Sequence, residues 1–451
     1  MKKYDSYKDS GIEWIGEIPS HWEIKKLKYF GVITLGKMLT PEDKGGYVLK
    51  RYLRAKNIEW YSPNIEDVKE MWFSPKEVAQ YRLFKNDLLV SEGGEVGRTC
   101  IWNEEIDECY IQNSVHRVSF GGTENANYFL NQFILFGKKG HFDAIVNRIS
   151  IAHLTKEKLG DVQFIYPPIE EQTTIANYLD QKTSQIDDLI AKKERLIQLL
   201  EEERTAIINH AVTKGLPAEE RLKVGLDPTV PMKDSGIEWL GEIPAHWEVK
   251  RIKHLLNEPL KYGANESAEE ENLDDPRYIR ITDFGNDGKL KENTFKSLPY
   301  SKAENFLLNE GDILFARSGA TVGKTFFFKN YQGIACFAGY LIKASCNQKL
   351  LLPEFLYQFT NTGSYENWKQ SIFQQATIQN IGADKYNQLK IAIPPVSEQK
   401  EIIEFLEKKT SEIGLIISTT QQEIELLKEY KTALISEVVT GKVDVRNEKL
   451  N

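Results

Sequence analysis

The chain has 451 residues with 58 Lys and Arg, 66 Asp and Glu, a formal net charge of −8 and 41% hydrophobic residues. This length predicts two to four domains, and the negative charge argues against a protein that coats nucleic acid regardless of sequence. The sequence holds no run of 18 apolar residues, so we expect no transmembrane helix. The four cysteines form no CxxC and meet no zinc-like spacing, which predicts reduced thiols, no metal site and a cytoplasmic protein.

An arm of 22 residues opens the chain and returns in its second half. Residues 8–29 read KDSGIEWIGEIPSHWEIKKLKY, and residues 233–254 read KDSGIEWLGEIPAHWEVKRIKH. The arm recurs at an offset of 225 residues, and two further pairs recur at 225 or 226 residues: RYLRAKNI at Arg51 with RYIRITDF at Arg277, and DLLVSEGGEVGRT at Asp87 with DILFARSGATVGKT at Asp312. Because solenoid repeats have periods of about 20–50 residues, this offset predicts two domain-sized copies.

Each copy begins with an arm and continues into a body of short β-branched and aromatic runs separated by Gly, Asn and Asp. Such runs predict strands and turns, with NDLLVSEGG and GDILFARSG as buried strands that enter tight glycine turns. A long helix closes each copy, so the fold class is α+β with two mixed α/β bodies and an internal duplication. The predicted segments are 1–165 (arm and first body), 166–214 (first helix), 215–232 (linker), 233–392 (second arm and body), 393–441 (second helix) and 442–451 (tail).

The two helices carry matching apolar stripes. A Pro-Pro pair precedes each helix and ends any strand, and acidic residues near Glu171 and Glu398 suit a helix N-terminus. The stripes follow heptad spacing, and helices this long are best covered by pairing with each other. The predicted coiled-coil residues are Ile175, Leu179, Ile186, Ile190, Ile197, Leu200 and Ile207 in the first helix, and Ile402, Leu406, Ile413, Ile417, Ile424, Leu427 and Leu434 in the second.

Motifs with catalytic chemistry are weak in this sequence. SGATVGKT at Ser318 approaches a phosphate-binding loop, but its first glycine is misplaced, and a glycine turn between strands is the better interpretation. YPPI and IPPV lack the Asn or Asp and the aromatic residue of an amino-methyltransferase motif. We therefore predict a chain without catalytic residues.

Basic residues cluster with aromatic residues in both bodies, as in LKRYLRAKNIEWY and RYIRITDFGNDGKLK. Arginine reads guanine edges, and both Arg and Lys hold phosphates, so these segments are candidates for DNA contact. A solvated sheet face is the competing interpretation. The candidate DNA-binding residues are Arg51, Arg54, Lys56, Arg98, Arg277, Arg280, Arg317 and Lys324.

The arms SGIEWIGEIP–HWE, the helix starts PPIEEQ and PPVSEQ, and their duplication resemble the specificity subunit of type I restriction-modification systems. The resemblance implies two target-recognition domains, each reading half of a bipartite double-stranded DNA site. It implies that the two helices form an antiparallel coiled coil that separates the domains, sets their spacing and docks modification (methyltransferase) subunits. Restriction (translocase and nuclease) subunits join this complex. S-adenosylmethionine, ATP and Mg are then expected on partner subunits and no cofactor on this chain.

Two other functions remain open on the sequence. A coiled-coil scaffold would assemble protein partners without reading DNA, and an autonomous DNA-modifying enzyme would carry its own chemistry. The framework-like arms and helices beside diverged bodies favour the recognition subunit.

Overall fold

The computed structural model describes residues 2–146, 153–267, 271–285, 288–319, 321–373 and 380–448. The chain divides into two compact units, the first formed by Met1–Lys193 with Gln421–Asn451 and the second by Glu194–Thr420. Each unit therefore contains one arm, one body and a segment of each long helix.

The first unit begins with an antiparallel arm hairpin of β1 (Tyr7–Asp9) and β2 (Glu17–Pro19), followed by β3 (Glu23–Lys26), which pairs with β11 (Gln163–Tyr166). Its body holds a four-stranded sheet in the order β4-β10-β7-β8 and a three-stranded sheet in the order β6-β5-β9. These strands are β4 (Val32–Leu35), β5 (Val48–Leu53), β6 (Lys69–Phe73), β7 (Leu88–Ser91), β8 (Thr99–Ile101), β9 (Tyr110–Ile111) and β10 (Val115–Ser119).

The second unit repeats this topology, except that β6 has no equivalent strand among the described residues. Its arm hairpin is β12 (Met232–Asp234) with β13 (Glu242–Pro244), and β14 (Glu248–Arg251) pairs with β21 (Lys390–Ile393). The four-stranded sheet has the order β15-β20-β17-β18, and the parallel pair β16-β19 takes the place of β5-β9. These strands are β15 (Lys261–Tyr262), β16 (Arg277–Ile279), β17 (Ile313–Ala316), β18 (Thr325–Phe327), β19 (Ala335–Phe337) and β20 (Leu341–Ala344). The shared strand order confirms the predicted duplication, and β7 and β17 are the predicted buried strands.

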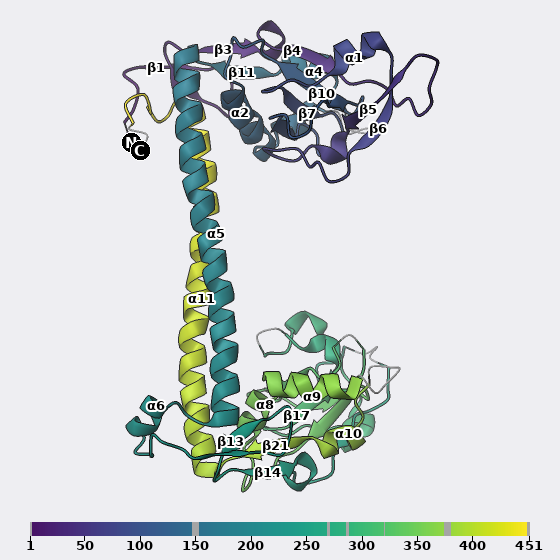
Figure 1. Ribbon diagram of the computed structural model, residues 1–451, viewed down its shortest axis with the longest axis vertical. Helices are drawn as coiled ribbons and strands as arrows, with labels where there is room; N and C mark the ends of the chain where they lie inside the picture. The colour runs from purple at the N-terminus through teal and green to yellow at the C-terminus, as the bar shows by residue number, and fades with distance from the viewer. Residues whose placement is uncertain are drawn as a thin grey trace. The chain divides into compact units, whose positions relative to one another are not determined.

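Short helices complete each body. In the first unit, α2 lies next to α5, and β5 and β6 lie on the far side of the body (Figure 1). The first unit contains α1 (Pro75–Tyr81), α2 (Ala126–Lys138), α3 (His141–Ile145), α4 (Lys156–Asp161), η1 (Leu27–Tyr29) and η2 (Ala55–Asn57). The second contains α6 (Ala218–Lys223), α7 (Tyr300–Ala303), α8 (Pro353–Phe359), α9 (Gly363–Phe373), α10 (Ala383–Gln388), η3 (Ile252–His254), η4 (Ile281–Asp283), η5 (Glu292–Thr294) and η6 (Glu304–Phe306).

The long helices are α5 (Ile169–Lys214) and α11 (Val396–Val439). Each begins three residues later than predicted, because Tyr166 and Ile393 pair in the strand ladders of β11 and β21. Prolines lack the N–H that would continue a ladder and suit the start of a helix, so the Pro-Pro pairs mark the change from strand to helix.

A buried glutamine explains the recurring EQ of the helix starts. Gln172 Nε2 donates to Pro167 O (3.0 Å), and its Oε1 accepts from Asn125 N (3.0 Å). Gln399 Nε2 donates to Pro394 O (3.0 Å), and its Oε1 accepts from Leu352 N (2.8 Å). The same side chain thus holds the Pro-Pro turn to the body in both copies, which satisfies backbone groups that the turn would leave unpaired.

The glutamate beside each glutamine fixes an arm to a helix. Glu171 accepts from Trp22 Nε1 (3.0 Å) and lies 2.7 Å from His21 Nε2. Glu398 likewise accepts from Trp247 Nε1 (3.2 Å) and lies 2.7 Å from His246 Nε2. The two equivalent histidines therefore have structural positions at the contact between arm and helix.

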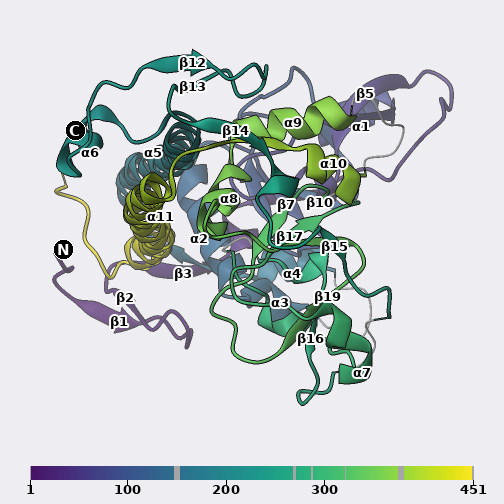
Figure 2. The ribbon, with the colours of Figure 1, turned by 90° about the horizontal axis from the view of Figure 1, so that it is seen from below.

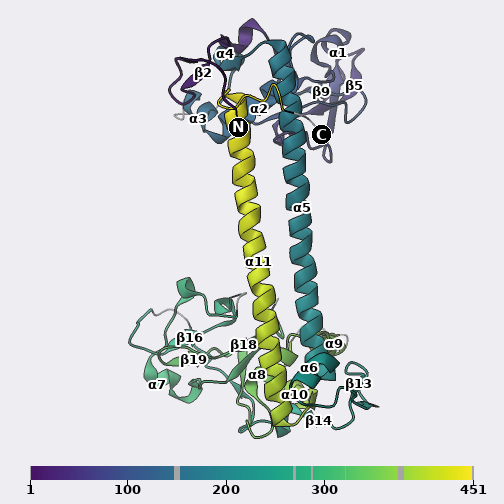
Figure 3. The same cartoon turned by 90° about the vertical axis from the view of Figure 1, so that its left-hand side faces the viewer.

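Within each unit, the segments of α5 and α11 lie side by side (Figure 2; Figure 3). In the first unit, Lys431 Nζ lies 2.7 Å from Asp187 Oδ1, and Lys193 Nζ lies 2.6 Å from Glu423 Oε2, so the segments run antiparallel. In the second unit, Ile208, Ala211 and Val212 share a core with Ile402, Ile403 and Leu406. Every predicted stripe residue is buried or half-buried.

The segments after the two helices each make fixed contacts within their own unit. Arg221 of α6 is buried and places Nη1 3.1 Å from Glu398 Oε1, while Asp444 N of the tail donates to Lys2 O (2.8 Å). The predicted linker 215–232 includes the short helix α6 and the first residue of β12. Cys100, Cys109, Cys336 and Cys346 are free and buried. Among the described residues, no helix is long and apolar enough to cross a membrane.

Candidate nucleic-acid interface

The predicted arginines at 54 and 280 occupy the same structural position. Each follows the last residue of a strand, β5 or β16, and caps the short helix η2 or η4. The backbone N–H of Arg54 donates to Asn57 Oδ1 (3.2 Å), and that of Arg280 donates to Asp283 Oδ2 (2.7 Å). The strand on one side and the capped helix on the other fix the backbone of each arginine, so each guanidinium is attached to a well-ordered segment.

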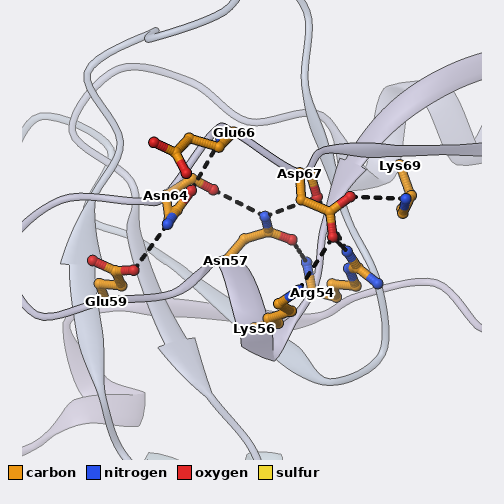
Figure 4. A network of polar contacts seen from close by, with 8 residues as sticks. All are labelled: Arg54, Lys56, Asn57, Glu59, Asn64, Glu66, Asp67 and Lys69. Carbon is orange, nitrogen blue, oxygen red and sulfur yellow. Dashed lines mark hydrogen bonds and ion pairs between the residues drawn. The ribbon is translucent and has the colours of Figure 1, made fainter. Parts of the chain in front are cut away.

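In the first body, three cations meet one carboxylate. Arg54 Nη2 lies 2.5 Å from Asp67 Oδ2, Lys69 Nζ lies 2.8 Å from Oδ1, and Lys56 Nζ lies 3.4 Å from Oδ2 (Figure 4). Hydrogen bonds from Lys69, then from Arg54 and Lys56, lower the pKa of the Asp67 carboxyl, so it is ionised at neutral pH. We call Arg54, Lys56, Asp67 and Lys69 the Asp67 cluster.

Two further predicted residues lie near this cluster. Arg98 Nη2 donates to Ala55 O of η2 (3.1 Å), and Arg98 Nη1 lies 3.1 Å from Glu95 Oε2. Arg51 points from β5 with 58% of its side chain exposed, 3.8 Å from Glu70 of the neighbouring strand β6. The structure thus gathers Arg54, Lys56 and Arg98 around η2 and leaves Arg51 on the open face of the sheet.

In the second body the equivalent arginines, Arg280 and Arg277, bind groups of the same body. Arg280 Nη2 lies 2.9 Å from Asp283 Oδ1 and donates to Thr294 O (2.7 Å), and Asp283 is fully buried. Arg277 is 7% exposed, donates from Nη2 to Lys291 O (2.7 Å) and lies beside the rings of Phe295 and Tyr331. Both arginines organise the loop after β16, and their contact with DNA stays a prediction.

The remaining candidates flank the turn between β17 and β18. Arg317 lies over the Tyr262 ring, 4.8 Å from its centroid, and Lys324 is half-buried. SGATVGKT therefore joins two antiparallel strands, whereas a phosphate-binding loop leads from a strand into a helix. The structure supports the glycine turn.

The second unit also contains a cleft of about 1020 Å³ between its body and its helix segments. Arg204 of α5 lines it opposite Arg277, Lys289 and Lys329 of the body, with the rings of Tyr331 and Tyr357 among them. Cations and aromatic rings together suit a nucleic-acid strand, and the carboxylates of Glu201 and Glu292 also line this cleft. Arg204 and Lys329 were missed by the sequence analysis, because they lie outside the segments that recur in the two copies.

Asn57, Asp67 and Lys69 were also missed. Asn57 and Lys69 stand in sequence among charged and aromatic residues that give no periodic signal, and Asp67 has no recurring counterpart in the second copy. The only feature of the sequence that could have pointed to Lys69 is the acidic residue Asp67, two positions earlier. Among the described residues, no group of three or more His, Cys, Asp or Glu side chains could hold a metal ion.

Comparison with known proteins gives consistent matches. A family model for the type I restriction modification DNA specificity domain matches residues 19–199 and 244–426. The chain is 22% identical over 448 residues to the putative type I restriction enzyme MjaX specificity subunit of Methanocaldococcus jannaschii, covering 96% of each chain. It is 24% identical to the type I restriction enzyme EcoKI specificity subunit of Escherichia coli K12, covering 87% of this chain and 83% of that one.

Solved structures show the same fold. The HsdS subunit from Thermoanaerobacter tengcongensis aligns with a TM-score of 0.55 at 13% identity, covering 94% of this chain and 98% of that one. A chain from a structure described as the basis of complex assembly and conformational transition of the type I R-M system aligns with a TM-score of 0.65 at 14% identity. That alignment covers 94% of this chain and 99% of that chain.

Proposed function

The chain belongs to the family of type I restriction-modification DNA specificity subunits, and we propose on this premise that each of its two bodies reads one half of a bipartite DNA site. One observation carries the proposal: the two copies share strand order, helix starts and Trp–Glu contacts, but their charged groups after β5 and β16 differ. A shared framework with different surfaces is what reading two different sequences requires. A scaffold without DNA readout would give no reason for this difference.

Partner subunits are proposed to supply the chemistry. Modification subunits would bring S-adenosylmethionine and methyl transfer, and restriction subunits would bring ATP, Mg and DNA cleavage. This chain would dock the modification subunits on α5 and α11 and act with them in the cytoplasm. Because its net charge is −8, we expect tight DNA binding only in the assembled complex.

A test of the DNA contacts uses single alanine variants in the complex with modification subunits. Arg51→Ala is the first choice, since its exposed side chain contributes little to the interior. If Arg51 reads a base, affinity falls by about 1–3 kcal/mol and specificity relaxes at one position. If it holds a phosphate, all sequences lose affinity and the slope of log affinity against log salt becomes shallower by about 0.9.

Arg98→Ala, Arg317→Ala and Lys324→Ala extend this series, and Arg251→Ala is the control. Arg251 is an exposed arginine of the arm strand β14, outside both bodies. Binding that stays at the wild-type level for every body variant, as for Arg251→Ala, would remove these residues from the interface.

The proposed spacing role of the helices predicts a change in the DNA spacer. One heptad inserted in α5 between 193 and 194, and another in α11 between 420 and 421, keeps the apolar stripes in phase. Seven residues add about 10 Å of helix, which corresponds to roughly three base pairs. The preferred spacer, measured by methylation of duplexes with varied spacers, should lengthen accordingly.

Two-residue insertions at the same points are the control, because they rotate the following apolar stripe by about 200° and should weaken helix pairing. If the heptad variant is fully helical and still prefers the original spacer, the helices do not set it.

A further inference from the structure

The cations of the Asp67 cluster are arranged as they would be around a phosphate. The two oxygens of the Asp67 carboxylate contact the guanidinium of Arg54, which caps η2, and the ammonium groups of Lys56 in η2 and Lys69 in β6. Lys56 and Lys69 have 74% and 54% of their side chains exposed, and Asp67 has 42%. Arginine and lysine bind carboxylate and phosphate oxygens through the same charge-assisted hydrogen bonds. The cluster is therefore open to solvent on the side where a larger anion could approach.

The position of Asp67 does not depend on its ion pairs alone. Asn57 is 2% exposed, and its Nδ2 donates to Asn64 O (2.9 Å) and to Asp67 O (3.2 Å). The Asp67 carbonyl also accepts from Arg54 Nη2 (3.1 Å). The buried side-chain amide of Asn57 thus binds the backbone of this loop to η2. This contact holds the Asp67 carboxylate beside the three cations (Figure 4).

The second body neutralises its equivalent arginine differently. Asp283 occupies the position of Asn57 and binds Arg280 from within η4, fully buried. Its carboxylate contributes to the interior, whereas Asp67 stands at the surface with two exposed lysines. In the second body a single buried carboxylate is enough to pair with the capping arginine. Capping of η2 therefore does not explain why the first body places an exposed carboxylate and two exposed lysines around Arg54.

We propose that Arg54, Lys56 and Lys69 form a DNA phosphate site on the first body, and that Asp67 competes with the phosphate and thereby suppresses binding to non-cognate DNA. Non-specific affinity arises from cations that release counterions from the duplex on binding. Cations already paired with an internal carboxylate contribute less to this release. Cognate DNA gains base contacts in addition, so Asp67 raises the ratio of specific to non-specific affinity. The inference rests on the proposed reading of DNA by this body.

The test compares Asp67→Asn with Glu66→Gln in the complete complex with modification subunits, using fluorescence binding to a non-cognate duplex between about 0.1 and 1 M salt. Both variants remove one negative charge from adjacent residues, but Glu66 is exposed and forms no ion pair within the described part of the chain. We expect Asp67→Asn to bind non-cognate DNA about eightfold more tightly near 0.1 M salt. This is one added phosphate contact, with a slope of about 0.9 over a tenfold range of salt.

A second comparison isolates the cations. Lys56→Ala with Lys69→Ala should change non-cognate binding little in the wild-type background and should remove most of the gain in the Asp67→Asn background. Binding to cognate DNA should rise less than binding to non-cognate DNA, so the specificity ratio falls. The side-chain amide introduced by Asp67→Asn can still accept from Arg54, and circular dichroism should confirm an unchanged fold.

Equal effects of Asp67→Asn and Glu66→Gln would show that only overall charge matters and would overturn the inference. Weaker non-cognate binding by Asp67→Asn would overturn it as well. A wild-type complex that fails to distinguish cognate from non-cognate duplex would instead refute the proposed function, so the two failures are distinguishable.

Discussion

Exchange of residues 30–162 for the corresponding body of another type I specificity subunit is expected to change one half of the recognised DNA site and leave the other half intact. The exchange keeps the arm, β3, β11 and both long helices, which carry the Trp22–Glu171 and Gln172–Pro167 contacts. The body joins this framework partly through α2. Gln132 Nε2 donates to Ile165 O (2.7 Å), Gln132 Oε1 accepts from Ile165 N (2.9 Å), and Tyr128 lies buried against Val439.

A donor body with glutamine and tyrosine at these two positions should therefore dock without redesign. The measurement is sequencing of methylated bases in cells that carry the hybrid chain with its modification subunits. Exchange of residues 255–389, which keeps β14 and β21, is the matched experiment and should change the opposite half. If one exchange altered both halves, or if neither exchange altered any, the bodies would not be separate readers.

Trp22→Ala is expected to lower the free energy of unfolding of the first unit by about 3–5 kcal/mol, as large-to-small substitutions of buried aromatic residues do. Trp22 is fully buried, packs edge-on against Tyr4 at 5.4 Å between ring centroids and donates to Glu171. Gly441, after α11, lies so close that an added Cβ would come within 2.8 Å of the Trp22 ring. The indole therefore joins arm, helix start and tail, and alanine leaves a cavity and a carboxylate with one donor fewer.

The free energy of unfolding is measured by titration with urea, and hydrogen exchange is used to follow each unit separately. Trp247→Ala should produce the corresponding loss in the second unit, where Trp247 is fully buried and donates to Glu398. Trp72→Ala on β6 is the control, because this half-buried ring leaves a smaller cavity. A loss for Trp22→Ala no larger than that for Trp72→Ala would contradict the role assigned to the arm.

The sequence alone determined the framework of this protein. The recurring arms, the Pro-Pro pairs followed by EQ, and the heptad stripes are local patterns. Each has a direct physical consequence: a buried indole, a strand that stops, and an amphipathic helix. Repetition strengthened these predictions, because a pattern that occurs in both copies indicates that the same contacts form in both. The duplication, the buried strands and the long helices could therefore be predicted, although Tyr166 and Ile393 extend a strand ladder before each helix begins.

Only the tertiary structure decided how each predicted cation is used. Arg54 and Arg280 stand at equivalent places in the sequence, but one meets a carboxylate 13 residues away on an exposed loop and the other meets a buried carboxylate three residues away. Arg277 looked like Arg51 and is buried, whereas Arg51 is exposed. Burial and ion pairing depend on which loops fold over a strand, and the loops are where the two copies differ. Local pattern therefore predicts the strand or helix that carries each charge, and the long-range packing of the loops determines which charges reach the surface.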